Sequence, residues 1–180
     1  FLLLPELVAA SQIADRQYMT KPTPGTFNQP GAVDFVRDVS IGRERGFYSS
    51  SFSLLLGTST SGAQIRYSTD GSTPTATTGR VYSGPISIMG TSTIRAGAFK
   101  TGWLSSRIIT HTYIFPSDVI RQSPTGAAPG AGWPTGSVNG QILDYGMDPN
   151  IVNDARWASD VQNALRAIPS ISIVTDLPNL

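Results

Sequence analysis

The sequence predicts an antiparallel, mainly β fold, because short stretches of alternating side chains are separated by strong turn signals. Residues 65–69 (IRYST) alternate apolar and polar side chains with the period of a half-buried strand. Asp70-Gly71 follows at once, and this dipeptide is typical of tight turns. The 180 residues also include 18 Gly and 13 Pro, so we expect many turns and few long helices.

Three short extended elements are predicted before this stretch and three after it. Those before it are 39–42, 45–48 and 52–56, the last with Leu55 facing away from the core.

Those after it are 81–88, 93–99 and 108–115. Residues 108–115 are partly apolar on both faces, as expected where one face covers a core and the other meets a flanking segment. The predicted core includes Phe52, Ile65, Tyr67, Ile86, Ile94 and Ala96.

Long irregular flanks surround these strands. Residues 1–37 are predicted to be an extended linker, in which 1–4 (FLLL) is either a signal-peptide core or a short element docked on a neighbour. The second interpretation is favoured, because no positively charged region precedes 1–4. We expect the chain to be a piece of a longer polypeptide, since it starts with Phe and not Met.

Residues 116–180 are predicted to form a turn-rich segment lying over a surface, then one helix and a strand. The helix should span 154–168, capped by Asn153 or Asp154, and residues 171–175 (ISIVT) should form the strand. The apolar stripe of the helix comprises Trp157, Val161, Ala164, Leu165 and Ile168. We expect Trp157, Val161 and Leu165 to pack against an apolar surface.

Several spaced motifs resemble one known family. Residues 65–75 (IRYSTDGSTPT), 82–86 (YSGPI) and 93–96 (TIRA) are similar, in this order, to the chitobiase/β-hexosaminidase C-terminal-type domain. The resemblance covers residues 38–115. It implies a small immunoglobulin- or fibronectin-III-like antiparallel β-sandwich that is a non-catalytic appendage of large secreted bacterial proteins.

The flanks carry resemblances of their own. Residues 18–28 (YMTKPTPGTFN) resemble the closing segment of a lamin-tail-type domain. Residues 118–124 (DVIRQSP), 145–149 (YGMDP) and 172–176 (SIVTD) resemble the lead-in to a spore-coat-protein-H-like kinase domain. These resemblances imply that 1–37 closes a preceding domain, and that 116–180 leads to a following domain whose catalytic motif is not among these residues.

Composition excludes several classes of function. The chain has no Cys, which excludes disulfides and thiolate chemistry. A net charge of +1 and the absence of any Lys/Arg run exclude a basic nucleic-acid surface. No apolar run approaches the roughly 20 residues that a membrane-spanning helix needs.

No catalytic, metal or cofactor site is predicted. His111 is the single histidine and has no carboxylate or further ligand at a recognisable spacing. Acidic residues cluster over 144–154, but without the spacing of a calcium loop, so we interpret them as turn and cap residues. Glu6 and Glu44 are the only glutamates and form no plausible hydrolytic pair.

Four aromatic residues are the candidate contacts for a ligand or partner: Trp103, Tyr82, Trp133 and Tyr145. Exposed rings stack on sugars, whereas most aromatic side chains in a sandwich pack in or around the core. Trp103 lies in the turn 101–103 and is predicted to be the most exposed of the four.

We therefore predict a structural or interaction module of a secreted, surface-attached or periplasmic bacterial protein. Its flanks should pack against neighbouring domains or other subunits, because isolated apolar residues in long flanks would otherwise stay in water. The alternative is a carbohydrate-binding accessory module of a larger glycosidase or kinase. The two hypotheses differ in whether the aromatic rings form an open row or are covered.

Overall fold

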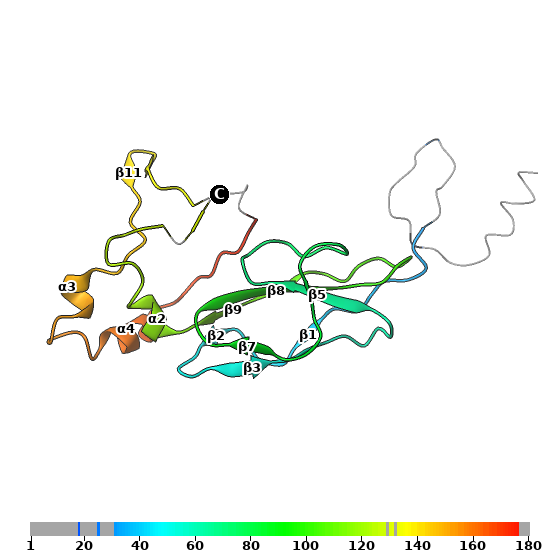
Figure 1. The fold of residues 1–180 in the computed structure, drawn as a ribbon, viewed down its shortest axis with the longest axis horizontal. Coiled ribbons are helices and arrows are strands. Elements are labelled where there is room, and N and C mark those ends of the chain that lie inside the picture. The colour runs from blue at the N-terminus through cyan, green and yellow to red at the C-terminus, as the bar shows by residue number, and fades with distance from the viewer. Residues whose placement is uncertain (1–17, 19–24, 26–30, 129, 132, 177–180) are drawn as a thin grey trace, which may run out of the picture.

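The computed structural model describes residues 18, 25, 31–128, 130–131 and 133–176, and its centre is a two-layered β-sandwich (Figure 1). This confirms the predicted mainly β fold with an immunoglobulin-like sandwich. The element predicted near the start of the chain and most of the connector 18–28 lie outside the described residues.

The larger layer is a five-stranded sheet with the order β2-β9-β8-β5-β6. Its strands are β2 (Gly46–Phe47), β5 (Gln64–Ser68), β6 (Arg80–Val81), β8 (Ser92–Phe99) and β9 (Ile109–Ile114). The pairs β5–β6, β5–β8 and β8–β9 are antiparallel. β2 pairs in parallel with β9, so the sheet departs from the predicted antiparallel pattern at this edge.

The second layer consists of two short antiparallel ladders. β1 (Ser40–Ile41) pairs with β4 (Leu56–Gly57), and β3 (Phe52–Leu54) pairs with β7 (Ile86–Ile88). Leu55 connects β3 to β4 and is 56% exposed, whereas Leu54 and Leu56 are buried. The alternation predicted for residues 52–56 is thus confirmed.

The core lies between the two layers. Three of the six predicted core residues, Ile65, Ile94 and Ala96, are buried, and the other three pack against the core half-buried. The buried core residues of the sandwich are Val36, Val39, Leu54, Leu56, Ile65, Ile88, Ile94, Ala96, Ala98, Tyr113 and Phe115.

An aromatic cluster closes one end of this core. The ring of Tyr113 lies edge-on to Tyr48 and Phe52, with centroids 5.6 and 5.2 Å away. The Tyr113 hydroxyl donates to the carbonyl of Arg43 at 3.0 Å. Burial raises the pKa of Tyr113 to about 12, so the phenol stays neutral and acts as a hydrogen-bond donor.

The region after the sandwich contains short elements only. They are α2 (Pro116–Val119), β10 (Ser137–Val138), β11 (Gln141–Ile142), α3 (Pro149–Val152) and α4 (Val161–Ala167). α2 was not predicted. It follows β9 directly, and its Asp118 accepts a hydrogen bond from the Thr91 backbone N–H at 2.8 Å, which fixes it to the turn between β7 and β8. No helix in the described part of the chain is long and apolar enough to cross a membrane.

The predicted C-terminal helix exists, but it begins at Val161 and not at residue 154. Asp154 does cap the backbone N–H of Arg156, yet residues 155–160 form turns before the helix. Trp157 is 50% exposed, so its expected packing is wrong, whereas Val161 and Leu165 are half-buried. Among the described elements α4 lies against the short α2, which is too small to cover the stripe.

The predicted strand at 171–175 is also wrong. These residues have no regular secondary structure, although the segment follows an irregular path beside the five-stranded sheet. The segment instead contacts the sheet through side chains, as the next subsection describes.

Candidate functional site on the outer face of the five-stranded sheet

The outer face of the five-stranded sheet, opposite the core, is where segments distant in sequence meet. The register pairs Arg95 with Thr110, and Thr93 with Thr112, which places these side chains on one face. Ile94, Ala96 and Ala98 face the core instead, as predicted. The outer face is therefore polar at its centre and is free to receive the chain that returns from α4.

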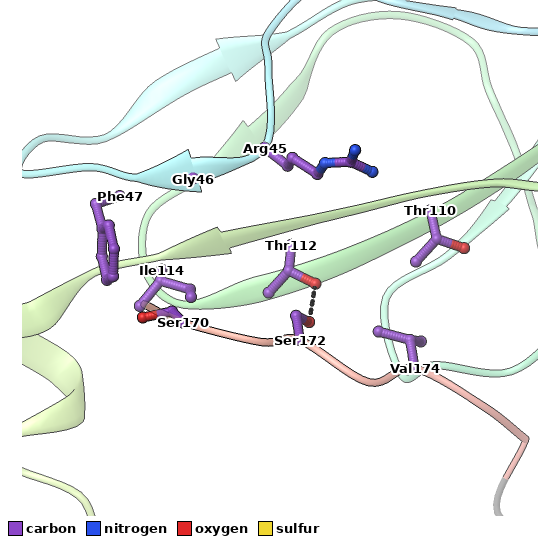
Figure 2. Close-up of a pocket in the computed structure, with 9 residues that line it drawn as sticks. All are labelled: Arg45, Gly46, Phe47, Thr110, Thr112, Ile114, Ser170, Ser172 and Val174. Atoms are coloured by element: carbon purple, nitrogen blue, oxygen red, sulfur yellow. Dashed lines mark hydrogen bonds between the residues drawn. The ribbon is translucent and has the colours of Figure 1, made fainter. Parts of the chain in front are cut away.

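Residues 170–176, named here the tether, cross part of this face. Figure 2 shows Ser170, Ser172 and Val174 pointing toward β9. The hydroxyls of Ser172 and Thr112 are 2.7 Å apart. A shallow groove of about 510 Å³ lies between the tether and the sheet, with Arg45 and Phe47 at its β2 side. The expectation that the outer face of residues 108–115 meets a flanking segment is confirmed.

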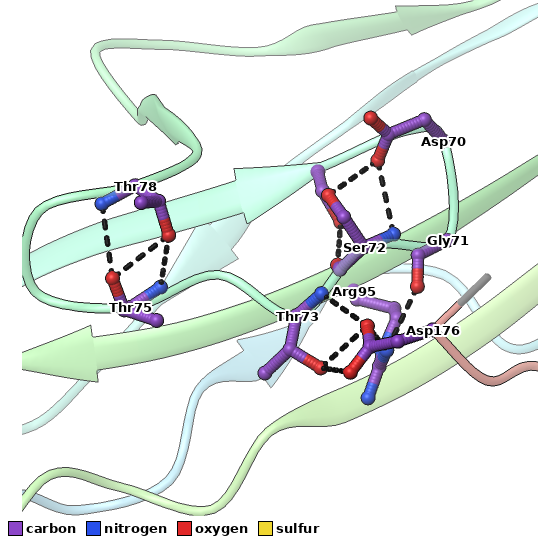
Figure 3. A network of polar contacts seen from close by, with 9 residues as sticks. Asp70, Gly71, Ser72, Thr73, Thr75, Thr78, Arg95 and Asp176 are labelled. Carbon is purple, nitrogen blue, oxygen red and sulfur yellow. Dashed lines mark hydrogen bonds and ion pairs between the residues drawn. The ribbon is translucent and has the colours of Figure 1, made fainter. Parts of the chain in front are cut away.

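The far end of the tether is held by a cluster of polar contacts, named here the anchor: Thr73, Arg95 and Asp176 (Figure 3). Asp176 Oδ1 accepts hydrogen bonds from the Thr73 backbone N–H at 2.8 Å and from the Thr73 hydroxyl at 2.9 Å. The same oxygen is 3.0 Å from Arg95 Nη1. Arg95 Nη1 also donates to the Gly71 carbonyl at 2.8 Å.

Electrostatics favour the charged form of the anchor. Hydrogen bonds from Thr73 lower the pKa of the Asp176 carboxyl below its usual value, and Arg95 adds to the effect. The Arg95 side chain is 14% exposed and the Asp176 side chain 44% exposed. The Arg95 guanidinium thus balances the charge of the Asp176 carboxylate, so the anchor is a structural ion pair.

A second groove of about 710 Å³ lies on the same face, nearer β5, and is named here the Trp103 groove. One wall is the loop 73–76 and another is the segment 99–106. Phe99 and Ile108 are among its apolar lining residues, and both pack over Gly97, where an added Cβ would lie 2.5 Å from Ile108. Gln64 adds a polar amide to the lining.

Trp103 itself is less accessible than predicted. Its ring is half-buried and packs against the core, and Lys100 Nζ lies 4.0 Å from the ring centroid. Lys100 Nζ also donates to the Ser61 carbonyl at 3.1 Å, which holds the ammonium over the indole. A ligand that stacks on this face of the indole must displace Lys100.

Tyr82 is half-buried against the core, and its hydroxyl accepts a hydrogen bond from the Leu56 backbone N–H at 3.1 Å. This contact links the two layers of the sandwich. The Tyr82 hydroxyl therefore has a structural role in the sandwich that involves no ligand.

Trp133 and Tyr145 lie together in the region after the sandwich, with ring centroids 5.9 Å apart in an edge-on arrangement. Trp133 is 39% exposed, which makes it the most exposed of the four candidate aromatic residues, whereas Trp103 was predicted to be. The Tyr145 hydroxyl donates to the Pro134 carbonyl at 2.7 Å. The structure thus pairs Trp133 with Tyr145 and brings neither of them to the Trp103 groove.

In the described part of the chain, no group of three or more His, Asp or Glu side chains is placed so that it could hold a metal ion. His111 Nδ1 lies 3.2 Å from the Arg43 carbonyl, which gives the ring a structural partner. In the acidic stretch, Asp144 and Asp148 each accept a backbone N–H two residues ahead, as turn and cap residues do.

Sequence reasoning missed the anchor. The predicted core positions of Ile94 and Ala96 place Arg95, which lies between them, on the opposite face, but its partner Asp176 lies 81 residues further along the chain. A lone charged residue in the middle strand of a sheet does signal that a counter-ion is needed. Nothing local indicates which of the aspartates provides it.

One family matches the chain. Residues 44–110 match the family model of the Chitobiase/beta-hexosaminidase C-terminal domain, from just before β2 to the start of β9. No curated protein matches the chain. No match supports the lamin-tail-type and kinase-type resemblances of the two flanks.

Proposed function

We propose that this chain is a non-catalytic accessory module of an exported bacterial protein, in which the sandwich fixes the flanking segments and packs against neighbouring domains or subunits. The proposed location is extracellular, on the cell surface or periplasmic, since chitobiase-type domains typically occur in secreted proteins. The proposed division is 1–37 as linker, 38–115 as sandwich and 116–180 as the segment toward a following domain.

The single observation that carries this proposal is the attachment of the tether to the outer face of the sheet. The returning segment is bound through the Ser172 hydroxyl to Thr112 and, at its far end, through the ion pair and hydrogen bonds of Asp176. The polar side chains at the centre of the face are thereby used to hold the chain itself. Such a use of polar groups is what a spacer or assembly module requires.

A second candidate function is carbohydrate binding in the Trp103 groove. The observation that favours it is the combination of apolar floor and polar rim: Phe99 and the half-buried Trp103 lie in the same groove as Gln64 and Lys100. Sugar rings present apolar faces and hydroxyl edges, so they suit such a lining. Displacement of Lys100 from the indole costs about 0.5–1 kcal/mol, which a stacked sugar has to exceed.

One set of assays separates these candidates. The purified chain is incubated with chromogenic β-N-acetylglucosaminides and with labelled ATP, and its retention on insoluble chitin and cellulose is measured. We expect no turnover and no retention above that of an unrelated protein. Turnover would contradict the non-catalytic proposal.

Retention on a polysaccharide would favour the second candidate, provided that the Trp103→Ala variant loses it. The matched control is Trp133→Ala, because Trp133 is an exposed tryptophan that lies outside the Trp103 groove. Equal retention of wild type and Trp103→Ala would exclude the Trp103 groove as the binding site.

A further inference from the structure

The loop that follows β5 forms one wall of the Trp103 groove and also receives the anchor. Thr73, Pro74, Thr75 and Ala76 line the groove. Thr73 also donates hydrogen bonds to Asp176 from both its backbone N–H and its hydroxyl. We propose that the tether is a positioning device, in which Asp176 sets the conformation of the loop 70–79 and with it the width of the Trp103 groove.

The hydrogen bonds within the loop form two sets, one on each side of Thr73. On one side, Asp70 accepts from the Ser72 backbone N–H at 3.0 Å and from its hydroxyl at 2.6 Å, and Ser68 donates to the Ser72 carbonyl. On the other side, Thr75 and Thr78 are joined by hydroxyl and backbone contacts (Figure 3).

These two networks are each self-contained, and Thr73 lies between them. Within the described part of the chain, its backbone N–H and its hydroxyl both donate to the Asp176 carboxylate. The angle between the two halves of the loop is therefore held by the tether at Thr73, together with the buried side chain of Pro74.

The ion pair adds a second constraint to the same loop. Arg95 comes from β8, the central strand of the sheet, and its Nη1 contacts both the Gly71 carbonyl and Asp176. Gly71 has a φ of +83°, a left-handed conformation that glycine adopts without strain. In this conformation its carbonyl points toward Arg95 Nη1. When Asp176 is present, the sheet, the loop and the tether share one set of contacts.

Removal of the Asp176 charge leaves Arg95 with the Gly71 carbonyl alone among the described partners of its Nη1. The Arg95 Nε is already buried without a hydrogen-bond partner in the described part of the chain. The guanidinium is then stabilised by moving toward water, and the hydrogen bonds from Thr73 are weakened, because they end on a neutral amide oxygen and no longer on a carboxylate. The outer wall of the Trp103 groove should open as a result.

Hydrogen–deuterium exchange of the whole chain tests this proposal without any ligand. In the Asp176→Asn variant we expect amides of the loop 70–79 to exchange faster, on the order of tenfold, because the charge-assisted hydrogen bonds are weakened. Amides of β8 should exchange as in wild type. A Thr73→Val variant, which lacks only the hydroxyl, should give a smaller increase in the same loop.

The matched control is Asp154→Asn, which removes the charge of a half-buried aspartate paired with Arg156 elsewhere in the chain. It should leave exchange in the loop 70–79 unchanged. Faster exchange confined to residues 170–176 in Asp176→Asn, with the loop as in wild type, would overturn the proposal. Equal acceleration in the loop and in β8 would also overturn it, since the effect would then be global.

The benefit of this device to a ligand rests on the carbohydrate site proposed above, and the two can fail separately. Loop acceleration without retention of the wild-type chain on chitin or cellulose would leave the positioning device intact and exclude a site for these polysaccharides. Retention that is lost in Trp103→Ala, together with an unaffected loop in Asp176→Asn, would support the site and exclude the device.

Discussion

At the scale of single residues, the buried serine Ser106 shows how one polar side chain stabilises the sandwich through specific hydrogen bonds. Ser106 is buried, and its hydroxyl accepts a hydrogen bond from the Ala98 backbone N–H at 2.8 Å. The same hydroxyl donates to the Arg107 carbonyl at 2.9 Å. One side chain thus satisfies a donor and an acceptor where the chain turns between β8 and β9.

Ser106→Ala should lower the free energy of unfolding by about 1–3 kcal/mol, because the Ala98 N–H would stay buried without its partner. The neighbouring Ser105→Ala is the control and should change it by less than about 0.5 kcal/mol, since Ser105 is exposed. Urea unfolding followed by tryptophan fluorescence measures both. Equal effects of the two substitutions would refute the role given to the Ser106 hydroxyl.

At the scale of elements, the connection between β5 and β6 contains two glycines with a positive φ, Gly71 and Gly79, of which Gly71 forms the turn next to β5. Gly71 has a φ of +83°, a conformation that costs an L-residue about 1–2 kcal/mol. Gly84, between β6 and β7, has an ordinary φ and no atom within 4 Å of an added Cβ. Gly71 and Gly84 therefore differ in backbone strain, and Gly71 also lies beside the tether, since an added Cβ there would be 3.7 Å from the Thr175 carbonyl.

Gly71→Ala should destabilise the protein by about 1–2 kcal/mol. Gly84→Ala should be neutral or stabilising by up to about 1 kcal/mol, because alanine restricts the unfolded chain. Thermal unfolding of the two variants provides the comparison. A larger loss in Gly84→Ala than in Gly71→Ala would contradict the assignment of strain.

The elements that were predictable from sequence are those whose pattern is local. β5 and β8 follow from alternating side chains and a strong turn at Asp70-Gly71, and the core faces of both were assigned correctly. The start of α4 and the state of residues 171–175 were not predictable in this way. A stripe such as that of Trp157 becomes helical or buried only if a partner covers it, and the sequence does not give the partner.

The candidate site shows the same limit. The turn carrying Trp103 is visible in the sequence, but its burial depends on Lys100 lying over the ring, which only the folded chain shows. Likewise, Thr73 is one hydroxyl in a run of serines and threonines. Its role arises from Asp176, which is 103 residues away.

At the scale of the whole molecule, acid should weaken the fold at several carboxylates at once. Hydrogen bonds from Arg107, Ser72 and Thr73 lower the folded-state pKa of Asp38, Asp70 and Asp176, respectively. A lowered folded-state pKa means that the stabilisation is complete above the unfolded value of about 3.9 and is lost as the pH falls through the folded value.

The melting temperature should therefore change little, as far as these groups are concerned, from pH 7 to about pH 5 and fall progressively below about pH 4. The Asp38→Asn and Asp176→Asn variants should each show a shallower fall, since one of the responsible carboxylates is gone. Differential scanning calorimetry across pH 2–7 measures this. A melting temperature that rises on acidification below pH 4 would contradict the sign.

The anchor also determines how the molecule responds to mechanical load. A force applied to the chain at residue 176 acts first on the Asp176 contacts and then on the contact of Ser172 with Thr112, so the tether peels away one contact at a time. The segment from Ile120 to Asp176 then extends by up to about 200 Å before the load reaches β9. The contacts between the tether and the outer face of the sheet thus break before the hydrogen bonds of the sandwich come under load.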